Sequence, residues 1–115
     1  MPDLVPDIVN RYFVALNSND REGLLALFTP NAVVVDEGQT WRGTSEIRTW
    51  CDNVAFKFQY IAEVLGVETD GDGDYVARTR LEGNFPGGSV ELRVRFDLDG
   101  GQIRRLEIAA WPVVG

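Results

Sequence analysis

The chain has 115 residues, of which 44% are apolar, and 18 acidic against 11 basic side chains give it a net charge of −7. This size and composition predict a single domain, residues 1–115, with a continuous core. The negative charge argues against nucleic acid and anionic membranes as partners because it repels both. The sequence contains no histidine, which excludes the Ser-His-Asp triad, Cys-His pairs and the usual zinc ligands.

The sequence shows neither a membrane-spanning segment nor a secretion signal. No apolar run reaches the roughly 18 residues that a membrane-spanning helix needs. The N-terminal residues MPDLVPD lack the basic and apolar regions of a signal peptide, so we expect a cytoplasmic protein. The single cysteine, Cys51, has no partner for an internal disulfide. Its place beside Trp50 indicates a packed thiol, with a reactive thiol as the alternative.

Two helices are predicted at the start of the chain. Apolar residues recur at three- and four-residue spacing within Val5–Leu16, which predicts a helix with one buried face over about residues 4–17. The polar segment Ser18–Asp20 can cap a short second helix. We expect this helix to continue through Phe28 and to end at Pro30, because the residue before a proline avoids helical angles.

A buried strand and a third helix follow. The β-branched run Ala32–Val35 predicts the strand, which leads into Asp36. Residues Gln39–Gly43 are predicted to form a loop, and Thr44 can cap the third helix. The buried face of that helix is expected to contain Ile47, Trp50, Cys51 and Val54.

Beyond Phe56 the hydrophobic period changes from about 3.6 to 2. Three glycine-rich turns, at 70–74, 85–88 and 99–101, divide this half into a meander of four strands. The strand Val90–Leu98 alternates apolar with charged side chains, which predicts one face against the helices and one charged outer face. The charges on that face are expected to pair across strands or to form a dimer contact. The class predicted is therefore α+β.

The order and spacing of several segments resemble a known superfamily. They are Tyr12 followed by ALNSND, the segment LLALFTPNAVVVDEG, the residues WRG before a helix with Ile47, and a last strand that ends in Trp111. Together they resemble the nuclear transport factor 2-like superfamily, and within it the SnoaL-like and ketosteroid isomerase-like domains. The resemblance implies a cone-shaped, cystatin-like barrel in which a curved, mostly antiparallel sheet wraps three helices of the N-terminal half. It also implies an apolar pocket for a small apolar molecule, and a homodimer that pairs through the sheet.

The same resemblance implies roles for individual residues. Asp36 matches the catalytic base at the end of the first strand, and Tyr12 matches the tyrosine that donates to the oxyanion. Leu92 stands where ketosteroid isomerases place a protonated aspartate as a second donor, so this chain departs from their pattern. The residues expected to line the ligand pocket are Phe28, Val34, Trp41, Trp50, Phe56, Phe85, Leu92 and Trp111.

Each of these residues has a simpler structural interpretation. Asp36 and Glu37 can begin a solvated turn, and Tyr12 can be a core residue of its helix. The tryptophans can likewise be core residues. The run Asp70–Asp74 resembles the start of a calcium loop, but a β-hairpin turn explains it better because Leu81 stands where a bidentate glutamate is needed. We therefore predict no metal and no cofactor.

Two functions remain open from the sequence. The first is an enzyme in which Asp36 mediates proton transfer or water activation on an apolar carbonyl, polyketide-like or terpenoid compound. The second is a non-catalytic domain of the same fold that binds an apolar ligand or dimerises. The fold alone does not choose between them, because it carries enzymes and binding proteins alike.

Overall fold

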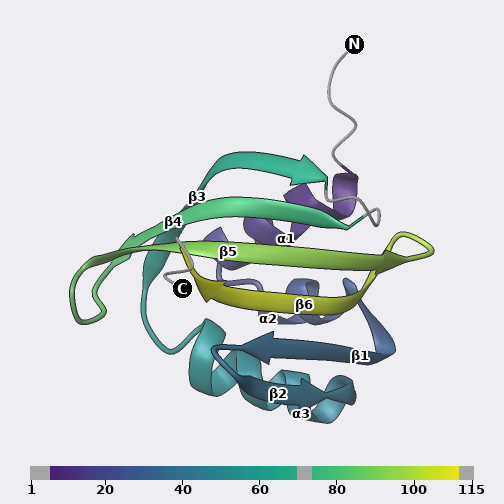
Figure 1. Ribbon diagram of the computed structural model, residues 1–115. Coiled ribbons are helices and arrows are strands. Elements are labelled where there is room, and N and C mark those ends of the chain that lie inside the picture. The colour runs from purple at the N-terminus through teal and green to yellow at the C-terminus, as the bar shows by residue number, and fades with distance from the viewer. Residues whose placement is uncertain (1–5, 70–73, 112–115) are drawn as a thin grey trace.

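The computed structural model describes residues 6–69 and 74–111. In chain order the elements are α1 (Asp7–Asn17), α2 (Arg21–Leu25), β1 (Phe28–Asp36), β2 (Gln39–Arg42), α3 (Gly43–Trp50), the π-helix η1 (Cys51–Ala55), β3 (Tyr60–Thr69), β4 (Tyr75–Gly83), β5 (Ser89–Asp99) and β6 (Gln102–Ala110). The strands form one curved six-stranded sheet in the order β2-β1-β6-β5-β4-β3, with the helices on one face (Figure 1). β1 and β6 run parallel, and every other neighbouring pair is antiparallel. The predicted α+β class, with helices in the N-terminal half, is confirmed.

Helix α1 buries the apolar face that its spacing predicts. Its buried residues are Ile8, Val9, Tyr12, Phe13, Ala15 and Leu16. The helix begins after Pro6, and the predicted start at residue 4, like Val5, lies outside the described residues. The side-chain amide of Asn17 donates to the carbonyl of Ala62 at 3.0 Å, and its oxygen accepts from the N–H of Ala62 at 2.7 Å. This pair of bonds fixes the end of α1 to β3.

The second helix is shorter than predicted, and Pro30 does not end it. Asp20 caps α2 by accepting a hydrogen bond of 2.9 Å from the N–H of Gly23. The chain leaves the helix after Leu25 and already enters β1 at Phe28. Pro30 lies inside β1, where the pairing with β6 is interrupted between Phe28 and Val33. A proline is tolerated there because its missing N–H is not needed for the ladder.

The predicted loop at residues 39–43 is instead the edge strand β2, followed directly by α3. Asp36 pairs with Gln39 across a two-residue turn of Glu37 and Gly38, whose φ angles are 50° and 85°. Two consecutive positive φ angles are typical of the tight turn that closes a β-hairpin. The sequence Glu-Gly does not indicate such a turn as strongly as Asn-Gly or Asp-Gly does. Thr44 does not cap α3; the Glu46 carboxylate accepts from the N–H of Arg42 at 2.7 Å instead.

The third helix changes its winding after Trp50. Its α-helical part ends there and the chain continues as the π-helix η1. Ile47, Trp50 and Cys51 are buried as predicted, whereas Val54 is 37% exposed and Ala55 is buried in its place. The wider turn of a π-helix shifts the inward face by one residue, which explains the error.

The four-stranded meander is confirmed for the described residues; Asp70–Gly73 of the first predicted turn lie outside them. On the predicted inner face of β5, Val94 and Phe96 are buried and Leu92 is partly buried. Charged side chains on the outer face pair across strands, as in the contacts of Arg78 and Arg80 with Glu91 at 2.9 and 3.4 Å. No helix of residues 6–69 and 74–111 is long and apolar enough to cross a membrane.

Candidate active site

A cavity of about 400 Å³ lies between the inner face of the sheet and the helices. This volume falls within the range of about 300–1,000 Å³ that small-molecule sites occupy. The side chains that line it are Tyr12, Phe13, Leu16, Asp36, Glu37, Trp50, Asn53, Val54, Ala55, Lys57, Phe58, Tyr60, Thr79, Leu81, Phe85, Val90, Leu92, Val94 and Ile108. Most of them are apolar or aromatic, so the few polar groups are candidates for orienting a ligand.

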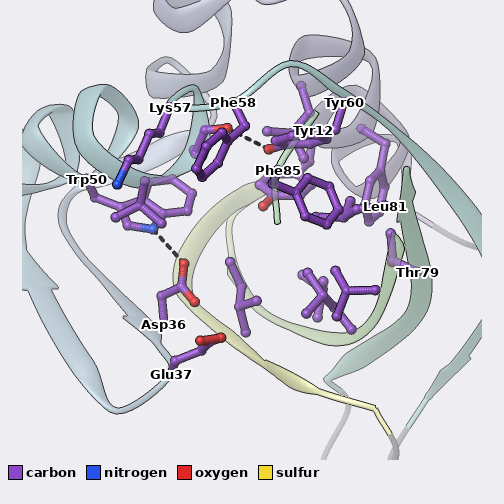
Figure 2. Close-up of a pocket in the computed structure, with 18 of the residues that line it drawn as sticks. Tyr12, Asp36, Glu37, Trp50, Lys57, Phe58, Tyr60, Thr79, Leu81 and Phe85 are labelled. Carbon is purple, nitrogen blue, oxygen red and sulfur yellow. Dashed lines mark hydrogen bonds between the residues drawn. The ribbon is translucent and has the colours of Figure 1, made fainter. Parts of the chain in front are cut away.

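Asp36 stands at one side of this cavity because β1 ends there. The tight turn at Glu37 and Gly38 terminates the strand, and the N–H of Glu37 donates to the carbonyl of Ile108 on β6 at 3.1 Å. The indole Nε1 of Trp50 donates to the Asp36 carboxylate at 3.0 Å, as Figure 2 shows. The half-buried carboxylate is thus held in place by a protein donor. The simpler interpretation, in which Asp36 begins a solvated turn, does not require such a contact.

The surroundings of Asp36 make its carboxylate a stronger base than a solvated one. Burial raises the pKa of Asp36 above its ordinary value, the hydrogen bond from Trp50 opposes this increase, and the nearby charge of Glu37 adds to it. Desolvation is the dominant cause because it penalises the charged form. A carboxylate with a raised pKa holds an abstracted proton more firmly, as a general base must.

Tyr12 lines the same cavity from α1. Tyr12 is 2% exposed, and its ring packs edge-on against Phe13 and Phe96, with ring centroids 4.9 and 5.2 Å away. Its hydroxyl makes no hydrogen bond with any described residue, although the residue is almost fully enclosed. Burial, followed by the charges of Tyr60 and Asp36, raises the pKa of Tyr12 well above its ordinary value. The hydroxyl therefore stays protonated and able to donate.

A second tyrosine, Tyr60 on β3, was not identified from the sequence. Its hydroxyl donates to the carbonyl of Ala55 at the end of η1 with a distance of 2.6 Å. Burial and the charge of Asp36 raise the pKa of Tyr60 to about 12. Because this hydroxyl already has a main-chain partner, Tyr60 fixes the π-helix at the cavity wall while Tyr12 keeps its donor available.

The thiol of Cys51 lies behind this wall and not in the cavity. Cys51 is fully buried, and burial raises its pKa to about 12. The packed thiol predicted from the sequence is therefore confirmed. The thiolate form of Cys51 is therefore scarce at neutral pH.

Three of the eight residues predicted to line the pocket do line the cavity, and five do not. Trp50, Phe85 and Leu92 line the cavity together with Asp36 and Tyr12. Five others, by contrast, are outside the cavity lining: Phe28, Val34, Trp41, Phe56 and Trp111.

Four of these five belong to the core, and the fifth to the outer face. Phe28 and Val34 are buried in β1, Trp41 packs against the core from β2, and Phe56 packs there after η1. Trp111 lies beyond β6, where the guanidinium of Arg78 sits 5.3 Å from its ring centroid. Ala110 pairs with cavity-lining Leu92, so the next residue points to the opposite side of the sheet.

Several lining residues were missed, and they differ in how well the sequence signals them. Thr79 and Leu81 on β4, and Val90 and Val94 on β5, follow the two-residue alternation that places Leu92 inside. That alternation is visible in the sequence. Lys57 and Phe58 follow the π-helix in a segment without periodicity, and no sequence signal indicates that they reach the cavity. Within residues 6–69 and 74–111, no three acidic or cysteine side chains are close enough to hold a metal ion.

Comparison with known proteins places these features in a family. The family model described as the SnoaL-like domain matches residues 9–106. The chain belongs to the SnoaL-like domain family. The comparison with curated proteins gives no significant match.

Solved structures support the same assignment. The SnoaL-like domain is similar to a candidate polyketide cyclase from Sinorhizobium meliloti, with 41% identity over 91% of this chain and 95% of that chain and a TM-score of 0.83. A protein with a ketosteroid isomerase-like fold from Catenulispora acidiphila has 19% identity over 91% and 85% of the two chains and a TM-score of 0.79. A Mycobacterium tuberculosis protein solved with estradiol-17beta-hemisuccinate has 16% identity over 93% and 92% and a TM-score of 0.77. The last two show the fold alone.

Proposed function

We propose that this SnoaL-like domain is a small-molecule enzyme that transfers a proton next to a carbonyl group, with Asp36 as general base. The observation that carries the proposal is the Asp36 carboxylate in the wall of a mostly apolar cavity, held by Trp50 and with a raised pKa. The similarity to a candidate polyketide cyclase favours an apolar, polyketide-like or terpenoid carbonyl compound as substrate.

The proposed step uses two side chains. Asp36 takes a proton from the carbon beside the carbonyl; the C–H electron pair forms a C=C bond, and negative charge moves to the carbonyl oxygen. The Tyr12 hydroxyl donates a hydrogen bond to that oxygen. Protonated Asp36 then returns the proton to another carbon, which is an isomerisation. Alternatively, the enolate carbon attacks a second carbonyl carbon of the same molecule, and the new C–C bond closes a ring. The proton then passes from Asp36 to the new alkoxide oxygen.

The same carboxylate can activate water in place of a carbon acid. In that variant Asp36 takes a proton from water, and the hydroxide attacks the carbonyl carbon of the bound molecule. The C=O electron pair moves to the carbonyl oxygen, and Asp36 returns the proton to that oxygen. The alternative function is a non-catalytic domain that binds an apolar ligand or dimerises. It is favoured by Leu92, which lines the cavity and offers no hydrogen bond to a developing oxyanion.

Proton transfer can be measured without knowing the natural substrate. The ketone 2-tetralone is a compact bicyclic molecule with exchangeable protons beside its carbonyl, and proton NMR in heavy water reports their replacement by deuterium. We expect the wild-type protein to accelerate this exchange. Asp36→Asn keeps the shape of the side chain and removes the base, so the acceleration should fall by about 10²–10⁴-fold.

The control for that experiment is Asp52→Asn. Asp52 is an exposed acid paired with Arg21 outside the cavity, so its loss should leave the exchange rate within a factor of two of wild type. Equal rates for wild type and Asp36→Asn would exclude Asp36 as the base. If 2-tetralone binds and the wild-type protein does not accelerate exchange, the result would contradict proton abstraction from carbon and favour the binding function.

A further inference from the structure

Thr79 is a buried polar residue on the cavity wall that the proposed proton transfer does not use. It lies on β4 and is 1% exposed, and it is the one polar or charged residue among the buried residues of 6–69 and 74–111. Its neighbours on the inner face of that strand are Ala77 and Leu81, and its partner on β5 is Leu92. A valine has almost the same shape and no hydroxyl to bury, so the hydroxyl of Thr79 needs a separate explanation.

The Thr79 hydroxyl has only a weak hydrogen-bond partner among the described residues. The hydrogen bond it makes among the described residues runs from Oγ1 to the carbonyl of Ala77, two residues earlier on the same strand, at 3.4 Å. Hydroxyl donors normally approach an oxygen to about 2.7–2.8 Å, so this contact is long and weak. A buried hydroxyl without a good partner is unfavourable, and a ligand oxygen in the cavity would supply one.

The position of Thr79 indicates which part of a ligand it would meet. Figure 2 shows Thr79 on the wall that faces Asp36 across the cavity. Leu92 and Val94 line the cavity from the neighbouring strand and provide only apolar contact. A ligand oxygen bound by Thr79 is therefore not the carbonyl oxygen beside the carbon that Asp36 would deprotonate. It is a second oxygen of the same ligand.

We propose that Thr79 is a specificity-determining residue that donates a hydrogen bond to a second, remote oxygen of the ligand. The ligand class is then an apolar ring system with two oxygen substituents at opposite ends, one near Asp36 and one, a carbonyl or hydroxyl, at Thr79. This inference rests on the proposed function in that it takes the cavity to be the substrate site.

A pair of matched probes tests it. The probe 6-acetyl-2-naphthol has at one end a hydroxyl, which can donate a hydrogen bond to the Asp36 carboxylate. At its other end it has a carbonyl oxygen, which needs a donor. In 6-isopropenyl-2-naphthol a methylene group replaces that carbonyl oxygen. Isothermal titration calorimetry should show that Thr79→Val weakens binding of the acetyl probe about fivefold to tenfold and changes binding of the isopropenyl probe less than twofold. Thr79→Ser should retain the preference for the acetyl probe.

Controls separate a binding role from a structural one. Thr40→Val, an exposed threonine on β2, should bind both probes as the wild type does. The ligand-free melting temperature of Thr79→Val should equal or exceed that of the wild type, and a decrease would assign the hydroxyl a structural role.

The outcomes also distinguish this inference from the proposed function. If Thr79→Val binds both probes as tightly as the wild type, or if Tyr12→Phe removes the preference and Thr79→Val does not, Thr79 is not the donor and the cavity remains the binding site. If the wild-type protein binds neither probe, the inference is wrong, and the proposed function is decided separately by the 2-tetralone exchange.

Discussion

The indole of Trp50 donates a hydrogen bond of 3.0 Å to the carboxylate of Asp36, and this contact joins a wholly buried helix residue to an acid at the end of a strand. It fixes the direction of the carboxylate inside a cavity where most other side chains are apolar. It also opposes the effect of burial on the pKa of Asp36. Trp50 is therefore a positioning residue for the proposed base, and four predictions follow from the groups around it.

The first prediction concerns Trp50→Phe, which keeps an aromatic ring and removes the N–H donor. Because the hydrogen bond lowers the pKa of Asp36, its loss should raise that pKa. The midpoint of the pH profile of 2-tetralone exchange should then move upward. The smaller ring should also reduce the free energy of unfolding by about 1–2 kcal/mol. The control is Trp41→Phe, since the buried Nε1 of Trp41 has no hydrogen-bond partner to lose. An unchanged midpoint in Trp50→Phe would contradict the positioning role.

The second prediction concerns stability and pH in Asp36→Asn. Burial raises the pKa of Asp36 in the folded state, so the folded protein binds this proton more tightly than the unfolded chain. Protonated Asp36 makes its full contribution to the free energy of unfolding below about pH 3.9, the pKa of the carboxyl in the unfolded chain. This contribution is lost as the pH rises through the pKa of Asp36 in the folded protein. Asparagine has no charge to bury, so Asp36→Asn should melt at a higher temperature than wild type at pH 7. That advantage should shrink as the pH falls toward about 3.9.

Glu91→Gln provides a control of opposite sign for the same melting experiment. The hydrogen bond from Arg78 lowers the pKa of Glu91, so its contribution is present above the unfolded pKa and is lost as the pH falls. This variant should therefore be less stable than wild type at pH 7 and approach it in acid. An Asp36→Asn protein that is less stable than wild type at pH 7 would show that the charge is not penalised by burial.

The third prediction concerns Tyr12→Phe. The ring contacts with Phe13 and Phe96 remain in this variant, and the hydroxyl has no partner among the described residues to lose. The melting temperature should stay within about 2 °C of wild type. The exchange rate should decrease by about 10²–10³-fold, because the oxyanion loses its donor. A large loss of stability without a loss of rate would make Tyr12 a core residue only.

The fourth prediction concerns the thiol of Cys51. With its pKa raised to about 12, the thiolate is scarce at pH 8. The fully buried sulfur is also out of reach of reagents. A disulfide reagent such as dithionitrobenzoate should therefore leave the folded protein unmodified over hours and react completely in denaturant. Rapid modification of the folded protein would contradict the buried position.

The sequence predicted the elements whose periodicity reports burial. The three- and four-residue spacing of α1 and the two-residue alternation of β5 each describe one face that must leave water, and both faces lie where expected. Two predictions were wrong: the loop at Gln39–Gly43, where the edge strand β2 forms, and the end of the second helix at Pro30, which lies inside β1. In each case tertiary pairing overrode a local preference: the hairpin accepts Glu37 at a positive φ, and an interruption in the β1–β6 ladder accepts Pro30.

The residue pattern was enough to predict the fold class and an acid at the end of the first strand. That Asp36, Tyr12 and Thr79 line one cavity, that Trp50 donates to Asp36, and that Trp111 lies outside the cavity became visible with the folded structure. The physical reason is that hydrophobic periodicity records which face of an element is buried and not what lies opposite that face. The cavity is formed by residues from α1, β1, α3, η1, β3, β4, β5 and β6 and from the loops between them. Their meeting depends on strand register and on a π-helical turn, which leave no local trace in the sequence.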